Sequence, residues 1–146
     1  MINSMETAEY MSSNPVTFTP DTDIFDAIHV ILEHRLSGAT VLNENKEVVG
    51  VISELDCLKA IINVGYYRQG GGRVADFMCT ESIQFMPEHT NIIDAAQMLI
   101  TNGHRRMPVE RNGQFIGQIS ARSLLQALKD SVAAHEDSED ALSGVD

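Results

Sequence analysis

The chain contains an internal repeat, and this repeat limits its fold more than any other feature. Tyr10-Met11 matches Phe77-Met78, and Gly50–Ser53 matches Gly117–Ser120, each 67 positions further along. Self-similarity at a fixed spacing is typical of a structural unit that occurs more than once. We therefore predict two related units over residues 7–64 and 74–132, joined by a glycine-rich linker over 65–73. Because each unit is small for a stable core, we expect the two to pack together with a groove where they meet.

The first repeat predicts a short extended piece, a helix, two strands and a second helix. The extended piece is Val16–Phe18, and the strands are Ala39–Leu42 and Val48–Ile52. Apolar residues at a 3.6-residue period predict both helices. The first helix follows the capping cluster Asp21–Asp23 and carries Ile24, Ala27, Ile28, Ile31 and Leu32; the second begins after Ser53 and carries Leu55, Leu58, Ile61 and Ile62.

The second repeat predicts the same order of elements. Ile83–Phe85 is the extended piece, and the strands Met107–Arg111 and Gln114–Ile119 flank Asn112-Gly113, a strong signal for a tight hairpin. Gly103 fits the end of the preceding helix. The two helical stripes are Ile92, Ala95, Ala96 and Leu99, then Leu124, Leu125 and Leu128.

Charge and composition exclude several classes of protein. The net charge of −11 argues against general affinity for nucleic acid or anionic membranes, because both would repel the chain at long range. We expect neither a membrane span nor a secretory signal, since no stretch reaches roughly 18 apolar residues and the N-terminus lacks a basic region before an apolar run. Cys57 and Cys79 lack disulfide or zinc spacing, and we expect a cytoplasmic protein. Residues 133–146 form an acidic tail that we predict to be disordered.

Three stretches resemble the CBS-domain pair, also called a Bateman module: Val74–Met78, Gly103–Val109 and Gly50–Asp56. The resemblance covers nearly the whole chain up to residue 132 and implies a pair that stands alone. It implies an α/β (α+β) fold of two tandem β-α-β-β-α units packed about a pseudo-two-fold axis. It also implies two clefts that hold AMP, ADP, ATP or S-adenosylmethionine as regulatory ligands, a homodimer, and no required cofactor.

The resemblance places a ribose-binding signature in the first repeat at Gly50-Val51-Ile52-Ser53-x-x-Asp56. A carboxylate can accept charge-assisted hydrogen bonds from both hydroxyls of a ribose, and a Ser at a helix start can face a phosphate. The same Ser-x-x-Asp spacing also fits a capping box that needs no ligand, and both interpretations stay open. The implied ligand-binding residues of this repeat are Val16, Thr17, Gly38, Ala39, Thr40, Ser53 and Asp56.

The second repeat departs from the signature, because Ser123 stands where the Asp belongs and offers one neutral hydroxyl. It keeps the apolar-Pro pair of the family, Met107-Pro108, where the first repeat has Ala39-Thr40. Its arginines form either a phosphate clamp or a solvated surface paired with nearby acids. The implied ligand-binding residues of this repeat are Ile83, Gln84, Arg105, Arg106, Met107, Pro108, Ser120, Arg122 and Ser123.

Other chemistry-bearing residues have simpler interpretations. The spacing of His29, Glu33 and His34 misses the common zinc helices, so we expect no metal site and surface or half-buried histidines. We interpret Cys57 as a small core residue, and Met78, Met86, Met98 and Met107 as packing residues.

The sequence thus predicts a regulatory module that binds an adenosyl ligand, signals by a conformational or dimer change to a protein that it regulates, and catalyses nothing. No nucleophile stands beside a base and no pair of acids forms an acid/base constellation, so hydrolysis of a bound nucleotide is disfavoured. The alternative is a ligand-free module for dimerisation or protein docking, which the missing Asp of the second repeat favours.

Overall fold

A computed structural model describes residues 5–63, 65, 72–81 and 83–143, with the backbone alone over 135–143. Most of the predicted linker and the last three residues therefore lie outside the described residues. The chain forms two compact units. The first-repeat body consists of Asn14–Gln84 and Arg111–Phe115, and the second-repeat body consists of Met1–Ser13, Phe85–Glu110 and Ile116–Asp146.

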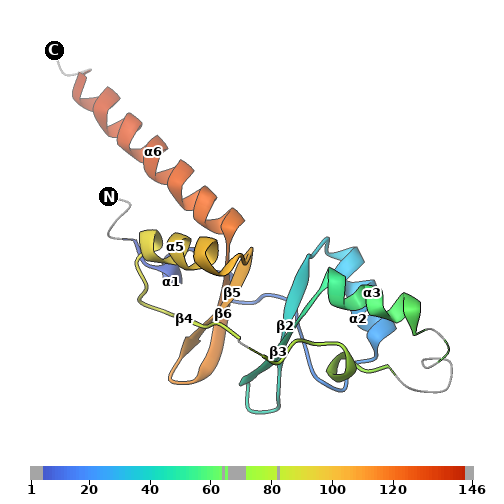
Figure 1. Cartoon of the computed structure of the whole chain (residues 1–146). Helices are drawn as coiled ribbons and strands as arrows, with labels where there is room; N and C mark the ends of the chain where they lie inside the picture. The colour runs from blue at the N-terminus through green and yellow to red at the C-terminus, as the bar shows by residue number, and fades with distance from the viewer. Residues whose placement is uncertain (1–4, 64, 66–71, 82, 144–146) are drawn as a thin grey trace. The chain divides into compact units, whose positions relative to one another are not determined.

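The first-repeat body is a three-stranded sheet with helices on one face (Figure 1). Its strands are β1 (Thr17–Phe18), β2 (Gly38–Leu42) and β3 (Val48–Ser53), in that order. β1 pairs with β2 in parallel and β2 with β3 antiparallel, so that Thr17 lies opposite Thr40 and Gly38 opposite Ser53. The helices are α2 (Ile24–Glu33), α3 (Glu54–Ile62) and the 3-10 turn η2 (Val74–Asp76).

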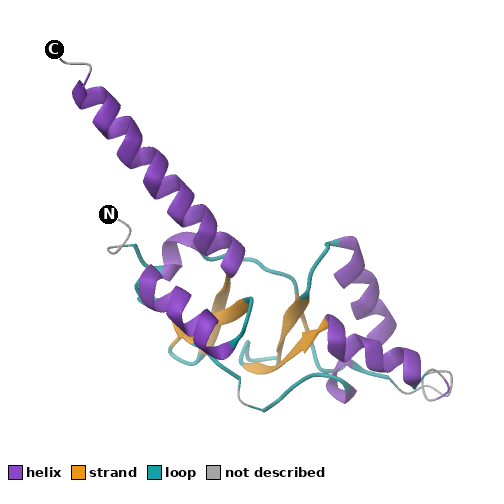
Figure 2. Cartoon of the chain, turned by 45° about the horizontal axis from the view of Figure 1, so that its top comes forward, coloured by secondary structure: helices purple, strands orange, loops and turns teal. Residues whose placement is uncertain are grey.

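The second-repeat body has the same layers (Figure 2). Its strands are β4 (Met86–Pro87), β5 (Arg106–Arg111) and β6 (Gln114–Ser120), and its helices are α1 (Thr7–Tyr10), α5 (Ile92–Asn102) and α6 (Ala121–Ser143). β4 pairs with β5 in parallel. The predicted mixed α/β architecture, with one such unit per repeat, is confirmed.

Local signals act as the sequence predicts. The Asp23 carboxylate accepts the N–H groups of Phe25 and Asp26 at 2.8 and 3.2 Å and so caps α2. Gly103 ends α5 with a φ of 65°. Asn112 and Gly113, at the hairpin between β5 and β6, have φ values of 52° and 80°, which is the left-handed pair that a type I′ turn requires.

The opening segment of each sequence repeat packs in the body of the other repeat. Ser12 exchanges two backbone hydrogen bonds with Gln118 of β6, at 2.8 and 2.9 Å, and Cys79 does the same with Val51 of β3, at 2.8 and 3.0 Å. A Cβ on Gly117 would stand 2.5 Å from the Ser12 carbonyl oxygen, so glycine permits this close approach. The compact units therefore differ from the ranges 7–64 and 74–132, because pairing of distant strands leaves no local signal.

Three other segments differ from the sequence expectation. Ile83–Phe85, which we predicted as the extended piece, precedes the strand, and β4 begins at Met86. Leu32 of the predicted α2 stripe is 70% exposed. α6 continues to Ser143, so residues 133–143 are helical where we predicted disorder; Ala133, Ala134, Glu136 and Glu139 are good helix formers, and a helix already nucleated upstream extends at low cost. Figures 1 and 2 show this last stretch of α6 extending away from its sheet.

The apolar stripes of α3 and α6 only partly face the core. Ala60 of α3 and Ala127 of α6 are buried, because small side chains let a helix lie close to its sheet, and Leu124 of α6 is buried as well. The other large apolar residues of these helices are exposed: Leu55, Leu58, Ile61 and Ile62 on α3, and Leu125, Leu128 and Val132 on α6. Each helix thus carries a second apolar face. The four methionines that we interpreted as packing residues do lie in or against the two cores.

Candidate ligand-binding site

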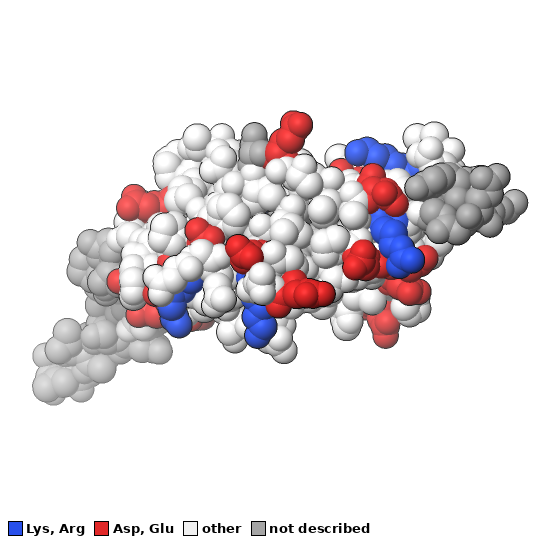
Figure 3. All heavy atoms as spheres, turned by 90° about the horizontal axis from the view of Figure 1, so that it is seen from below, with Lys and Arg blue, Asp and Glu red and all other residues white. Residues whose placement is uncertain are grey.

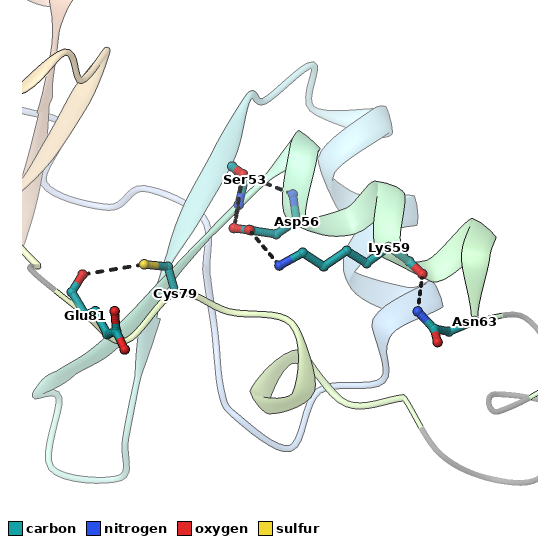
Figure 4. Close-up of polar contacts among 6 residues, drawn as sticks. All are labelled: Ser53, Asp56, Lys59, Asn63, Cys79 and Glu81. Carbon is teal, nitrogen blue, oxygen red and sulfur yellow. Dashed lines mark hydrogen bonds and ion pairs between the residues drawn. The ribbon is translucent and has the colours of Figure 1, made fainter.

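The start of α3 holds Ser53 and Asp56 in a reciprocal capping box (Figure 4). The Asp56 N–H donates to Ser53 Oγ at 3.1 Å, and the Ser53 N–H donates to Asp56 Oδ2 at 2.9 Å. The Ser53 hydroxyl also donates to Asp56 Oδ2, at 3.0 Å. The capping interpretation of Ser-x-x-Asp is therefore confirmed, and the Asp56 carboxylate is oriented by its own helix start.

The capping box uses one carboxylate oxygen of Asp56 and leaves the other for different partners. A carboxylate offers about four lone-pair sites, and the two hydrogen bonds from Ser53 occupy those of Oδ2. Oδ1 lies 3.7 Å from Nζ of Lys59, one turn further along α3. The Asp56 side chain is 19% exposed and the Lys59 side chain 59%. Asp56 thus keeps one oxygen outside the cap, beside a cation.

The start of α6 repeats this arrangement without any charge. The Ser123 N–H donates to Ser120 Oγ at 3.1 Å, and the Ser120 N–H donates to Ser123 Oγ at 3.0 Å. The Ser123 hydroxyl donates to the Ser120 carbonyl at 2.9 Å, so its one proton is already engaged. The start of α6 therefore has the same reciprocal cap as the start of α3. It has no carboxylate to hold a diol.

A broad, open depression of about 320 Å³ lies against the start of α6. Tyr10 of α1 forms part of its wall, and Arg122 and Gln126 come from the first turns of α6. Three residues predicted for the second-repeat site, Ser120, Arg122 and Ser123, therefore meet at one hollow. Arg122 is exposed and, within the part of the chain that the structure describes, takes part in none of the ion pairs. Among the described residues, Arg122 therefore does not show the pairing with nearby acids that was one of its two interpretations.

The remaining first-repeat candidates lie in or beside one sheet. Thr17 and Thr40 are neighbours on β1 and β2, and Gly38 is the partner of Ser53 across β2 and β3. Ala39 and Thr40 are almost fully buried in the body, at 3% and 1% exposure, while Val16 is half-buried against the core. The structure therefore brings this set together around the end of β3 and the start of α3.

The remaining second-repeat candidates are divided. Arg105 is exposed and Arg106 half-buried, whereas Met107 and Pro108 are buried in β5. The Arg105 carbonyl accepts the N–H of Ala121 at 2.9 Å, which places it beside the start of α6. Ile83 and Gln84 belong to the first-repeat body, so they do not share a body with the others.

Burial and two nearby carboxylates act on the Cys57 thiol at the α3 start. Burial raises the pKa of the Cys57 thiol, and the carboxylates of Asp56 and then Glu54 raise it further. Cys57 is half-buried against the core, as its interpretation as a packing residue requires.

On the face shown in Figure 3, Lys and Arg side chains are interspersed with Asp and Glu rather than gathered into a continuous patch.

The described part of the chain offers neither a metal site nor a membrane-spanning helix. Within the described residues, no three His, Cys, Asp or Glu side chains gather in a way that would hold a metal ion. His29 is exposed and pairs with Glu33 at 3.3 Å. None of the described helices combines the length and apolar character needed to cross a membrane.

Comparison with known proteins defines the family. Residues 8–63 and 74–130 each match the CBS domain. The chain therefore belongs to the CBS domain family and carries two of its domains in tandem, as the repeat and the two similar bodies indicate.

Individual relatives agree with this assignment. An uncharacterised 17.7 kDa protein of Acidianus ambivalens is 33% identical over 76% of this chain. CBSX2 of Arabidopsis thaliana, solved in complex with AMP, is 27% identical, covers 86% of this chain and 96% of its own, and has a TM-score of 0.74. A putative acetoin utilization protein of Vibrio cholerae has the same fold, with a TM-score of 0.81 at 16% identity over 91% of this chain and 96% of its own. The chain spans 65% of the first relative's length and 41% of a second, from Methanocaldococcus jannaschii.

The sequence did not predict three residues near these helix starts: Tyr10 and Gln126 at the depression, and Lys59 beside Asp56. Tyr10 was matched to Phe77 as part of the repeat, but only the packing of α1 in the second-repeat body brings it to the depression. Lys59 follows Asp56 by three residues on a predicted helix, a spacing that places two side chains on the same face. That signal was available in the sequence.

Proposed function

We propose that this CBS-domain pair is a regulatory module that binds an adenine nucleotide at the α3 start, with Asp56 accepting a ribose hydroxyl. A ligand that favours one arrangement of the protein over another shifts its population, and a partner protein reads the shift. The AMP complex of CBSX2, a 27% identical structure, supports the choice of ligand class. The proposal assigns no catalytic step to this site.

One observation carries this proposal: a neutral serine forms the same cap at α6 that Asp56 forms at α3, so the cap of α3 does not require the negative charge of Asp56. Ser123 caps α6 through a neutral hydroxyl in the same hydrogen-bonding pattern. A carboxylate that is 19% exposed costs desolvation that a serine avoids. Asp56 nevertheless keeps Oδ1 outside the cap, where it can accept a charge-assisted hydrogen bond from a ligand hydroxyl.

Isothermal titration of the full chain with AMP, ADP, ATP and S-adenosylmethionine tests the proposal. Saturable heat with at least one of these ligands is expected, and Asp56→Ala weakens it. Asp23→Ala is the matched control, since it removes a carboxylate that caps another helix of the same body, α2, and leaves the Asp56 carboxylate in place. Absence of heat at millimolar concentrations of all four ligands overturns the proposal.

We propose a second site with different chemistry at the start of α6, formed by four of the second-repeat candidates: Arg105, Ser120, Arg122 and Ser123. Arg105 and Arg122 offer guanidinium groups for a phosphate, and Ser123 cannot replace the carboxylate at a diol. We expect this site to bind a ribose-bearing ligand more weakly than the α3 start does.

The second candidate function is a ligand-free dimerisation module, and a repeated apolar surface supports it. Four apolar residues of the first repeat and their four equivalents in the second are each at least 47% exposed: Phe25, Leu32, Leu58 and Ile61, and Ile93, Ile100, Leu125 and Leu128. Exposed apolar residues at the same positions of both repeats favour an interface over chance. We propose that a second copy of the chain covers these residues. Each repeat carries the same apolar surface, and equivalent surfaces suit a symmetric, self-complementary contact.

Light scattering separates the two functions. We expect a dimer in solution, and a double substitution Leu58→Lys with Leu125→Lys should convert it to a monomer. A dimer that responds to none of the four adenosyl ligands would favour the second candidate. A wild-type chain that is monomeric at high concentration would exclude the dimer.

A further inference from the structure

We infer that Lys59 selects an anionic nucleotide over the uncharged nucleoside at the α3 start, an inference that rests on the proposed function. The oxygen of Asp56 that lies outside the cap, Oδ1, faces Lys59 Nζ at 3.7 Å. A ligand hydroxyl that reaches this oxygen therefore comes next to the ammonium group. Any negative group that the ligand carries close to that hydroxyl lies within the field of Lys59.

The negative charges around the site disfavour an anionic ligand, and a cation beside Asp56 offsets them. The Asp56 and Glu54 carboxylates both act on Cys57, where they raise the pKa of the thiol. A nucleotide phosphate that approaches Asp56 enters the same negative field, and the whole chain carries a charge of −11. Lys59 is the basic residue in the last turn of α3, and its long, flexible stem leaves the ammonium free to turn toward a phosphate.

The second repeat provides an internal control for this pairing. Ser123 stands in the place of Asp56, and Gln126 stands in the place of Lys59, both 67 positions further along. The carboxylate and the ammonium are thus present together in one repeat and absent together from the other. A surface ion pair at this spacing stabilises a helix only slightly. Helix stability alone therefore does not explain why Asp56 and Lys59 occur together.

A specificity role and a merely structural role predict different results when Lys59 is replaced. In the specificity role, Lys59→Gln, which copies the second repeat, weakens AMP binding about tenfold, the loss expected for one charge-assisted contact. Binding of adenosine, which has the same ribose and base without the phosphate, changes less than about twofold. Lys59→Arg restores the preference for AMP, because the positive charge returns.

Isothermal titration of the full chain with AMP and with adenosine measures this preference in the wild type, Lys59→Gln and Lys59→Arg. Lys129→Gln, which removes an exposed positive charge from α6, is the control for net charge and leaves the preference unchanged. Equal weakening of AMP and adenosine in Lys59→Gln, or no weakening of either, overturns the inference while the proposed function stands. A wild-type chain that binds neither ligand overturns both.

Discussion

The starts of α3 and α6 have the same backbone arrangement and different chemistry. In both, a serine at the end of a strand and the residue three positions later satisfy each other's N–H groups. In α3 the second residue is Asp56, with one oxygen outside the cap; in α6 it is Ser123, whose hydroxyl proton is already engaged. The comparison teaches that the cap requires an oxygen and not a charge. The charge of Asp56 is therefore available for another role.

The shared part of the two repeats is their core, and it should respond equally to truncation. Ile52 of β3 and Ile119 of β6 are equivalent and fully buried, at 1% and 0% exposure. Ile52→Ala and Ile119→Ala should each lower the free energy of unfolding by about 2–5 kcal/mol. Urea denaturation followed by circular dichroism measures this, and a loss below about 1 kcal/mol in either variant would contradict the equivalent packing.

The chemical difference between the repeats should respond to exchange of their cap residues. Asp56→Ser copies Ser123, so it should preserve the cap while it removes the carboxylate. We expect AMP binding to fall about 30-fold, in line with a hydrogen bond to a charged group of roughly 2 kcal/mol, with little change in the free energy of unfolding. Calorimetric titration and denaturation of the same sample measure both quantities. Loss of stability in proportion to loss of binding would show that Asp56 serves the fold alone.

The caps themselves should contribute equally in the two repeats. Ser53→Ala and Ser120→Ala each remove the hydroxyl that accepts an N–H at 3.1 Å. Each should lower the free energy of unfolding by about 1 kcal/mol. Thermal denaturation is the measurement, and a loss confined to one of the variants would show that the two helix starts are not equivalent.

A smaller difference should be visible at alkaline pH. The raised pKa of Cys57 means that the folded state holds the thiol proton more tightly than the unfolded state does. This contribution to stability is complete below the ordinary thiol pKa and is lost as the pH rises through the raised value. The second repeat has Leu124 at this position and no such titration.

Wild type and Cys57→Ala should therefore differ in the slope of stability against pH above about 8.5, the ordinary thiol range. Denaturation across the alkaline range checks this, and parallel curves would contradict the raised pKa of Cys57, whose first cause is burial.

The sequence predicted the features that depend on neighbouring residues. The order of elements, the Asp23 cap, the Gly103 stop and the Asn112-Gly113 turn are each encoded within a few positions, where local backbone preferences dominate. The Ser53–Asp56 cap was one of two open interpretations, and geometry alone confirms it. The ligand role of Asp56 stays a proposal.

Features that depend on distant pairing were not predictable in the same way. The segment around Ser12 belongs to the second-repeat body because it pairs with Gln118, and no local pattern encodes that choice. The apolar period of α3 identified a helix, but it did not tell which apolar face meets the sheet. The buried small residue Ala60 marks the face of α3 that meets the sheet. The position of a small residue on a helix next to a sheet was therefore the sequence signal for this face.

A site-resolved titration tests the central claim most directly. Amide NMR spectra of the full chain, recorded as AMP is added, report each helix start separately. The account predicts that the amide signals of Ser53 and Asp56 shift first and saturate at the lower AMP concentration. Shifts that appear first at Ser120 and Ser123, with Ser53 and Asp56 unmoved, would contradict it.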